Sequence, residues 1–236
     1  MRILVTGSSG FFGSWLIPGL EAAGHEIVGY DLKNGQDIQD AGALAEAMKG
    51  CQAVIHLAAY PHYMPPGTGA EPAPRPHSPQ EFTRRNIIGT ARVIEAMKRA
   101  KVGRLVYTSS GALYGFGPGR PLEGWVKPPI SEDQYPVGGD WAMIDAYGAS
   151  KIASEEWLKL VPTMTITALR INCIEPHHWG AKDGAHWGWY CLQATATRAY
   201  LAALERTKRG FVAVNVGEPS KNMDQSRLMK LWDGTL

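Results

Sequence analysis

The stretch TGSSGFFG (Thr6–Gly13) decides how the rest of the chain is interpreted. It follows the apolar run RILV, which is typical of a buried strand, and it precedes apolar residues at helical spacing. Gly7 would allow a tight turn, Gly10 would let the backbone approach a pyrophosphate, and Gly13 would let the helix pack closely on the strand. Backbone amides at the positive end of that helix would then hold phosphates. The stretch predicts a dinucleotide cradle, although a simple tight turn would also explain the glycines.

Two acidic residues downstream bear on the cofactor. Asp31 follows the next strand-like run, where a carboxylate accepts hydrogen bonds from the adenosine ribose and repels a 2′-phosphate. This position favours NAD over NADP, while the neighbouring Lys33 keeps NADP possible, and DLKNG is also a good turn sequence. Asp37 could contact the adenine edge or cap the helix that follows.

Strand-like and helix-like segments alternate along the 236 residues. We expect strands at residues 2–7, 25–31, 51–59, 104–110, 165–172 and 211–217. We expect helices at residues 11–24, 41–50, 80–100, 144–161, 196–210 and 225–232. This alternation predicts an α/β fold, a Rossmann-like doubly wound parallel sheet with helices on both faces and a small C-terminal substrate lobe. The functional crevice would lie at the carboxyl ends of the strands.

The predicted organisation has two parts. Residues 1–171 would form the NAD-binding Rossmann domain, and residues 172–236 a reduced or truncated substrate lobe interleaved with the last strand and helices of the sheet. The Pro- and Gly-rich residues 61–79 would form a mobile flap or lid.

Bulk composition excludes some partners. The net charge of +2 does not call for a nucleic acid or an acidic membrane as partner, and no apolar run is long enough to cross a bilayer. Only three cysteines occur, which indicates reduced thiols and a cytoplasmic location.

A proton-transfer set is predicted at YGASK. Tyr147 and Lys151 are four residues apart, so a helix puts both side chains on one face. A nearby ammonium favours the phenolate and lowers the pKa of a tyrosine, which could then act as acid or base. Ser109 and Ser110 end the strand at 104–110 and face the same crevice, where a hydroxyl could hydrogen-bond a substrate oxygen.

These motifs together resemble a known family. The ordered elements TGSSGFFG, YD followed by DI, HLAA, NIIGT, YTSSGALYG, YGASK and LRIN are similar to those of the extended short-chain dehydrogenases/reductases, the NAD-dependent epimerase and dehydratase group. The resemblance implies that Tyr147 is the catalytic acid/base and that Lys151 binds the nicotinamide ribose and tunes Tyr147. It implies that Ser110 polarises the reacting C–O group, with Ser109 as its neighbour or substitute. It also implies a sugar or nucleotide-sugar substrate and a homodimer formed through the helices at about 80–100 and 145–161.

The predicted site follows from the motifs and the resemblance together. The catalytic residues would be Ser110, Tyr147 and Lys151. The cofactor contacts would be Gly7, Gly10, Phe11, Phe12, Gly13, Asp31, Asp37, Ile38, Leu57, Ala58, Ala59, Asn86, Thr108, Tyr147, Lys151, Cys173 and Ile174. The substrate contacts would be Ser109, Ser110, Asn172, His177 and His178. Asn86 would support the active-site lysine through the backbone or water.

The segment NCIEPHHWGAKDGAHWGWYC (Asn172–Cys191) raises the question of a metal site. Its cysteines and histidines lack the paired spacings of zinc sites, and NAD would carry the redox chemistry, so no metal is predicted. The segment follows a strand end, which favours a substrate-side wall over a surface loop anchored by tryptophans.

Three functions remain open from the sequence. The first is an NAD-dependent sugar or nucleotide-sugar epimerase or dehydratase. The second is a uronate-type dehydrogenase that releases NADH, in which Arg170 would bind the substrate carboxylate; in the first function Arg170 would be a structural residue at a strand end. The third, a non-catalytic NAD-binding regulator, is disfavoured by the intact Ser, Tyr and Lys.

Overall fold

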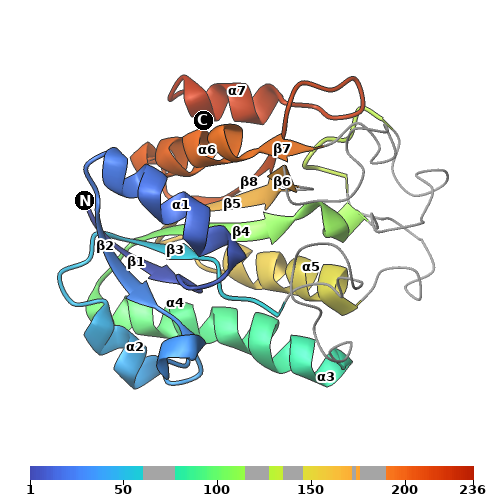
Figure 1. The fold of residues 1–236 in the computed structure, drawn as a ribbon. Helices are drawn as coiled ribbons and strands as arrows, with labels where there is room; N and C mark the ends of the chain where they lie inside the picture. Colours follow the sequence, from blue (N-terminus) through green and yellow to red (C-terminus); the bar gives the residue numbers. More distant parts are fainter. Residues whose placement is uncertain (61–77, 115–127, 135–145, 172–173, 176–189) are drawn as a thin grey trace.

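The fold is a parallel sheet of six strands in the order β2-β1-β3-β4-β5-β8, as Figure 1 shows. The computed structural model describes residues 1–60, 78–114, 128–134, 146–171, 174–175 and 190–236. The strands are β1 (Arg2–Thr6), β2 (Glu26–Tyr30), β3 (Ala53–His56), β4 (Arg104–Ser110), β5 (Thr165–Ile171) and β8 (Gly210–Val216). The doubly wound parallel sheet predicted from the alternating pattern is therefore confirmed.

The strand order reverses at β1, because β2 lies on one side of it and β3 on the other. Thr6 at the end of β1 is in register with His56 at the end of β3, and the Leu57 amide donates to the Thr6 carbonyl at 3.1 Å. Ligands of open α/β sheets bind outside the strand ends at such a reversal. The fold therefore places the glycine stretch where a dinucleotide would bind.

Helices cover both faces of the sheet and divide the core in two (Figure 1). One face carries α1 (Phe11–Ala22), α6 (Gln193–Glu205) and α7 (Ser226–Trp232); the other carries α2 (Ala41–Ala47), α4 (Gly89–Ala100) and α5 (Ala146–Lys159). Strands β3 and β5 are buried along their whole length, which explains why most of their residues are apolar.

The helix expected at residues 80–100 is divided. A short α3 (Pro79–Phe82) begins with Ser78 and Glu81 in a reciprocal capping box, and a π-helical stretch at Thr83–Ile88 precedes α4. π-Helical turns occur mainly inside longer helices and often at functional sites. Here the π-helical stretch contains the buried Asn86, one of the predicted site residues.

The C-terminal part of the chain contributes to the same sheet through β8. A second, two-stranded parallel sheet joins β6 (Ile174–Glu175) to β7 (Cys191–Leu192), and the sequence patterns did not predict it. This pairing brings the beginning of the predicted substrate-side segment, at Ile174–Glu175, next to its end, at Cys191–Leu192.

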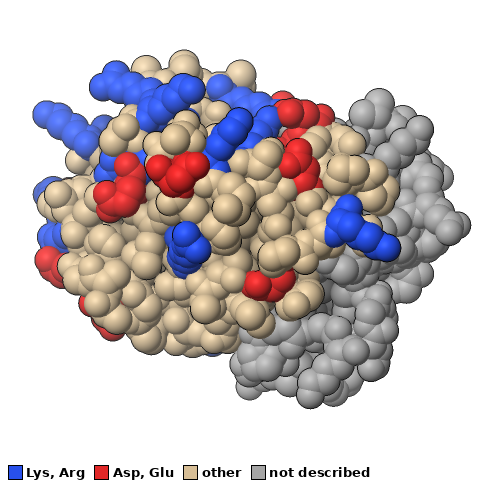
Figure 2. All heavy atoms as spheres, turned by 90° about the horizontal axis from the view of Figure 1, so that it is seen from above, with Lys and Arg blue, Asp and Glu red and all other residues tan. Residues whose placement is uncertain are grey.

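The surface above α6 and α7 carries mixed charge. Figure 2 shows Lys and Arg side chains gathered over part of this face, with Asp and Glu side chains between them. Among the residues that the structure describes, no helix has both the length and the apolar character that crossing a membrane requires.

Candidate cofactor and proton-transfer site

The turn after β1 has the geometry of a phosphate cradle. Gly7 has φ +71°, and a Cβ on it would lie 2.7 Å from the Ala58 amide nitrogen. A Cβ on Gly13 would lie 2.1 Å from the Ser8 carbonyl oxygen, so only glycine lets α1 pack this closely. Gly10 is the N-cap of α1 and has no side chain to occupy the amides of the first helical turn. The cradle thus fits a pyrophosphate approaching the backbone.

Asp31 lies beside this cradle. Asp31 is 7% exposed, and its carboxylate accepts hydrogen bonds from the Ser9 amide at 2.9 Å and the Lys33 amide at 2.8 Å. The Lys33 ammonium donates to the Ser9 carbonyl at 3.2 Å. The acid is therefore tied to the glycine stretch, and a cationic side chain lies at the same edge.

Asp37 forms an ion pair and does not cap a helix, which was one of the two roles that the sequence allowed. It pairs with Arg85 at 2.7 Å and accepts the Gln39 amide at 3.0 Å. The N-cap of α2 is Asp40, which accepts two amides of the first turn, so the capping role for Asp37 was wrong. The neighbouring Ile38 is buried and lies under Gly89, where a Cβ would come within 2.8 Å of its Cδ1 atom.

The chain after β3 forms one wall of the site. The Ala58 amide donates to Thr6 Oγ1 at 3.3 Å. The Asn86 side chain holds Tyr60 by both backbone groups, accepting its amide at 2.7 Å and donating to its carbonyl at 3.1 Å. Asn86 also donates to Ser150 Oγ at 2.9 Å, beside Lys151 on α5. The hydrogen bonds found for Asn86 thus connect the wall at 57–60 to the helix of the proton-transfer pair.

Helix α5 places Tyr147 and Lys151 together, as the spacing predicted. The Lys151 ammonium lies 5.5 Å from the Tyr147 ring centroid and donates to the Thr108 carbonyl at 2.8 Å. The side chain is buried, and burial lowers the pKa of Lys151 to about 7, against the opposing effect of the Glu155 carboxylate. Tyr147 is half-buried, with its ring edge-on to Phe82. The pair therefore contains a buried lysine whose cationic form is weakened by its removal from water.

The two serines at the end of β4 differ. Ser109 is buried and donates to the Glu155 carboxylate at 2.6 Å. Ser110 is half-buried, and its hydroxyl oxygen accepts the Ala112 amide at 3.1 Å. The structure gives Ser109 a buried internal partner for its only hydroxyl hydrogen, so toward a substrate Ser109 could only accept a hydrogen bond. Ser110 keeps a hydroxyl hydrogen for a substrate oxygen.

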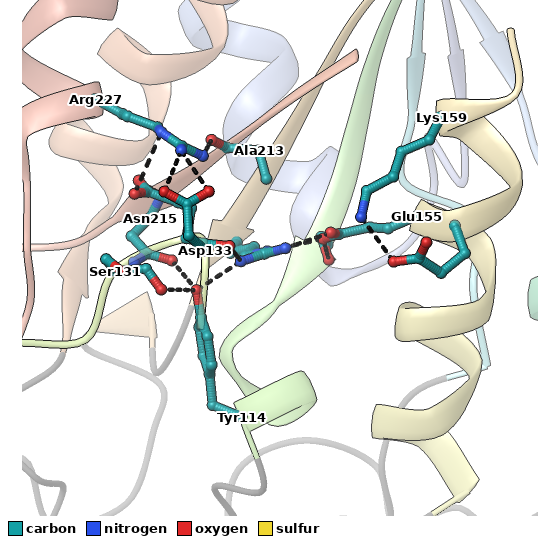
Figure 3. Close-up of polar contacts among 12 residues, drawn as sticks. Tyr114, Ser131, Asp133, Glu155, Lys159, Ala213, Asn215 and Arg227 are labelled. Carbon is teal, nitrogen blue, oxygen red and sulfur yellow. Dashed lines mark hydrogen bonds and ion pairs between the residues drawn. The ribbon is translucent and has the colours of Figure 1, made fainter. Parts of the chain in front are cut away.

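Sequence reasoning missed a buried polar cluster next to these serines (Figure 3). Arg170 on β5 donates to both Glu155 oxygens, at 3.0 and 2.6 Å, to the Tyr114 hydroxyl at 2.6 Å and to the Glu132 carbonyl at 2.8 Å. Tyr114 in turn donates to Asn215 on β8 at 2.8 Å. Arg170 is 1% exposed, so it is a structural residue at the strand end and not a ligand for a substrate carboxylate.

A hollow of about 600 Å³ lies beside the N-terminal half of β8, between Lys159 and Arg227. The predicted cofactor and catalytic residues do not line it. It is separate from the candidate site.

Several predicted residues lie outside the described part of the chain, namely Asn172, Cys173, His177 and His178. Ile174 is described and is 2% exposed, and the flanking Cys191 is a buried free thiol. Within the described ranges, no group of three or more His, Cys, Asp or Glu side chains is arranged to hold a metal ion.

A buried histidine lies beneath the site. His56 is 2% exposed, with Nδ1 2.7 Å from Thr6 Oγ1 and Nε2 3.2 Å from Thr90 Oγ1. Burial, aided by the Lys151 charge, lowers the pKa of His56 to about 3. The sequence contained a signal for this residue, since HLAA was among the family motifs, but nothing in the pattern assigned it a role.

This histidine should make the fold sensitive to acid. Its pKa is depressed in the folded state, so between about pH 3 and the unfolded value of 6.5 the unfolded chain binds the extra proton and stability falls as pH falls. From pH 6.5 to 5 the loss should be between about 1 and 2 kcal/mol. Urea unfolding of wild type and His56→Gln at both pH values measures it. An equal pH dependence in the two proteins would contradict the assignment.

The glycine turn at the strand-order reversal, the acid after β2 and the Tyr-x-x-x-Lys pair on α5 define a dinucleotide-dependent α/β protein of the short-chain dehydrogenase/reductase type. The chain belongs to the NAD dependent epimerase/dehydratase family, whose model matches residues 3–168. The cofactor of this family is NAD, which confirms the predicted cofactor, and the residues of the cradle fit it.

Known relatives within the family differ in chemistry. The chain is 30% identical over 197 residues to the 2-alkyl-3-oxoalkanoate reductase of Stenotrophomonas maltophilia, covering 78% of this chain and 52% of the relative. It is 33% identical over 183 residues to the UDP-glucose 4-epimerase of Mycolicibacterium smegmatis, covering 68% and 51%. The chain thus spans about half the length of these curated relatives.

Among solved structures, MoeE5 in complex with UDP-glucose and NAD is similar, with a TM-score of 0.68 and 25% identity. The similarity covers 93% of this chain and 77% of MoeE5.

Proposed function

We propose that this protein is an NAD-dependent oxidoreductase of the epimerase/dehydratase type that acts on a sugar or nucleotide-sugar. The observation that carries the proposal is the buried Lys151, fixed on the Thr108 carbonyl with Tyr147 on the same helix face and Ser110 half-exposed at the strand end. The UDP-sugar chemistry of the epimerase relative and of MoeE5 supports the substrate class.

In this proposal the chain's own residues position the substrate and move one proton. Bound NAD supplies the hydride acceptor. Tyr147 Oη accepts the proton of the reacting hydroxyl and returns it in the reverse direction, while the Lys151 ammonium stabilises the phenolate. Ser110 Oγ donates to the same substrate oxygen. The proposal assigns contacts with the nicotinamide to Cys173 and Ile174, and contacts with the substrate to Asn172, His177 and His178.

A second candidate is a dehydrogenase or reductase that turns over free NAD or NADH. The observation in its favour is the reductase activity named for the 30% identical relative. The two candidates share the proton-transfer set and differ in whether the hydride returns to the same substrate.

One experiment separates them. The purified protein is incubated with NAD and a panel of UDP-sugars and free uronic acids, and with NADH and 3-oxoacids, while NADH absorbance and product isomers are followed together. The proposal expects a sugar isomer or a dehydrated product without net NADH. Steady net formation or consumption of NADH would overturn it in favour of the second candidate, and turnover of no substrate would count against both.

Asp31→Ala should weaken NAD binding and relax the discrimination against NADP. The carboxylate that accepts ribose hydroxyls and repels a 2′-phosphate is lost, while Lys33 remains at the same edge. Titration of NAD and NADP by intrinsic fluorescence measures both effects. Asp40→Ala is the matched control, because it removes an acid from the N-cap of α2 and should leave the cofactor preference unchanged. An unchanged NAD to NADP ratio in Asp31→Ala would count against the assignment.

We further propose that the protein is a cytoplasmic homodimer that pairs through α4 and α5. Trp157 in the last turn of α5 is 40% exposed, Leu160 just after that helix is 77% exposed, and Ile88 just before α4 is 44% exposed. Sedimentation analysis of wild type and Trp157→Glu tests this. We expect the wild type to be a dimer and Trp157→Glu, which places a carboxylate in the interface, to be a monomer. A monomeric wild type would contradict the proposal.

A further inference from the structure

The hydrogen bonds around His56 have a defined direction. Thr90 Oγ1 donates to the Asn86 carbonyl at 2.7 Å, and a carbonyl can only accept. The single hydroxyl hydrogen of Thr90 is therefore used, so Thr90 must accept from His56 Nε2–H. With its hydrogen on Nε2, the neutral ring accepts at Nδ1 from the Thr6 hydroxyl. Thr6 Oγ1 in turn accepts the Ala58 amide.

The result is one chain of donors and acceptors that runs from Ala58 through Thr6, His56 and Thr90 to Asn86. Each hydroxyl in it donates once and accepts once, and His56, Thr6 and Thr90 are all at most 2% exposed. A second proton on the ring would give Nδ1 a hydrogen, and the Thr6 hydroxyl would lose the acceptor that it now has. The geometry therefore admits the neutral ring in one tautomer.

The groups that face His56 do not compensate a positive ring charge. Thr6 comes from β1 and Thr90 from α4, and both are neutral. The Tyr107 ring from β4 lies 5.7 Å away, and burial raises the pKa of its hydroxyl. The charged neighbour is the Lys151 ammonium from α5, which repels a second cation.

Both ends of this chain reach the candidate site. At one end, Ala58 lies in the wall at 57–60, in contact range of Gly7 in the cradle. At the other end, the Asn86 side chain holds Tyr60 and donates to Ser150 Oγ, which donates to the Tyr147 carbonyl at 2.7 Å. The wall is thus held at Ala58 by the hydrogen-bonded chain that ends on the Asn86 carbonyl, and at Tyr60 by the Asn86 side chain.

We propose that His56 is a positioning residue, locked as the neutral Nε2–H tautomer, which sets the NAD-side wall at 57–60 in register with the helix that carries Tyr147 and Lys151. The part that concerns Tyr147 rests on the proposed function. The tautomer and its effect on NAD binding do not, and both can be measured without a substrate.

The ring state is tested on the wild-type protein by long-range ¹H–¹⁵N correlation spectra with ¹⁵N-labelled histidine. We expect Nδ1 at the shift of an unprotonated nitrogen and Nε2 at that of a protonated one, both constant from about pH 5 to 8. The signals of His56 are assigned by their loss in His56→Gln or, if that variant does not fold, by their displacement in Thr90→Ser. A proton on Nδ1, or a titration within that range, would overturn the proposal.

The positioning role is tested with Thr90→Val and its matched control Thr90→Ser. Valine has the shape of threonine but leaves His56 Nε2–H without its acceptor, while serine keeps the hydroxyl. We expect the dissociation constant for NAD to rise about fivefold in Thr90→Val, because the wall at 57–60 loses its support and must be ordered when NAD binds, and to stay within about twofold in Thr90→Ser. Calorimetric titration of folded protein measures it. Equal affinities in the two variants, even with a less stable Thr90→Val, would show that the chain supports the core alone and would overturn the role.

Discussion

Tyr147→Phe is expected to lower turnover at least about a hundredfold, the usual range for loss of a general acid or base. The substitution removes only the phenolic oxygen. The ring keeps its edge-on contact with Phe82 and its place near the Lys151 ammonium, so the fold and the NAD site should be unchanged. Steady-state turnover on the substrate found in the panel, together with NAD titration of the same preparation, measures the two effects separately.

Tyr30→Phe is the control for this loss. Tyr30 ends β2 in the cofactor half of the sheet, and its hydroxyl donates to the Asp37 carbonyl at 3.2 Å. The same chemical change there should leave turnover within a few-fold of wild type, because that hydroxyl is remote from proton transfer. Near-normal turnover in Tyr147→Phe would reject Tyr147 as the acid/base.

Glu155→Gln is expected to lower the free energy of unfolding by about 3 to 5 kcal/mol, because it breaks a buried ion pair and leaves one charge without its partner. Glu155 and Arg170 have side chains 0% and 1% exposed and meet at 2.6 Å. Glu155 also accepts the Ser109 hydroxyl, so the loss extends to the end of β4. Urea unfolding at neutral pH measures the change.

The adjacent residue provides a matched control. Glu156 lies on the exposed side of α5 and pairs with Lys159 at 2.7 Å, with side chains 53% and 36% exposed. Glu156→Gln should therefore cost less than about 1 kcal/mol. Combining Glu155→Gln with Arg170→Met should recover part of the loss, since neither charge is then left alone. Equal losses for Glu155→Gln and Glu156→Gln would contradict the importance of the buried pair.

The geometry of the glycine turn could be predicted because its residues are close in sequence. Gly7, Gly10 and Gly13 belong to one turn and to the helix that follows it. Their spacing predicts close backbone packing, and a Cβ at Gly7 or Gly13 would indeed clash with neighbouring backbone atoms. Tyr147 and Lys151 share one helix face for the same local reason.

The roles of the two serines could not be separated in this way. Ser109 and Ser110 are neighbours of the same type, and the partner that distinguishes them, Glu155, is 46 residues away. The π-helical stretch at Thr83–Ile88 was also missed, because an amphipathic pattern does not distinguish a continuous helix from one that widens for a turn.

The sequence by itself determined the sheet class, the glycine turn before the first helix, the place of Asp31 beside that turn and the tyrosine–lysine pair. Each of these depends on spacings within one strand, turn or helix, where the local backbone geometry restricts which residue types fit. Only the tertiary structure decided that Arg170 pairs with Glu155, that Ser109 faces inward, and that His56 joins Thr6 to Thr90. Those contacts join segments 15 to 50 residues apart, and whether a buried polar group is satisfied depends on partners that only the packed fold brings within hydrogen-bonding distance.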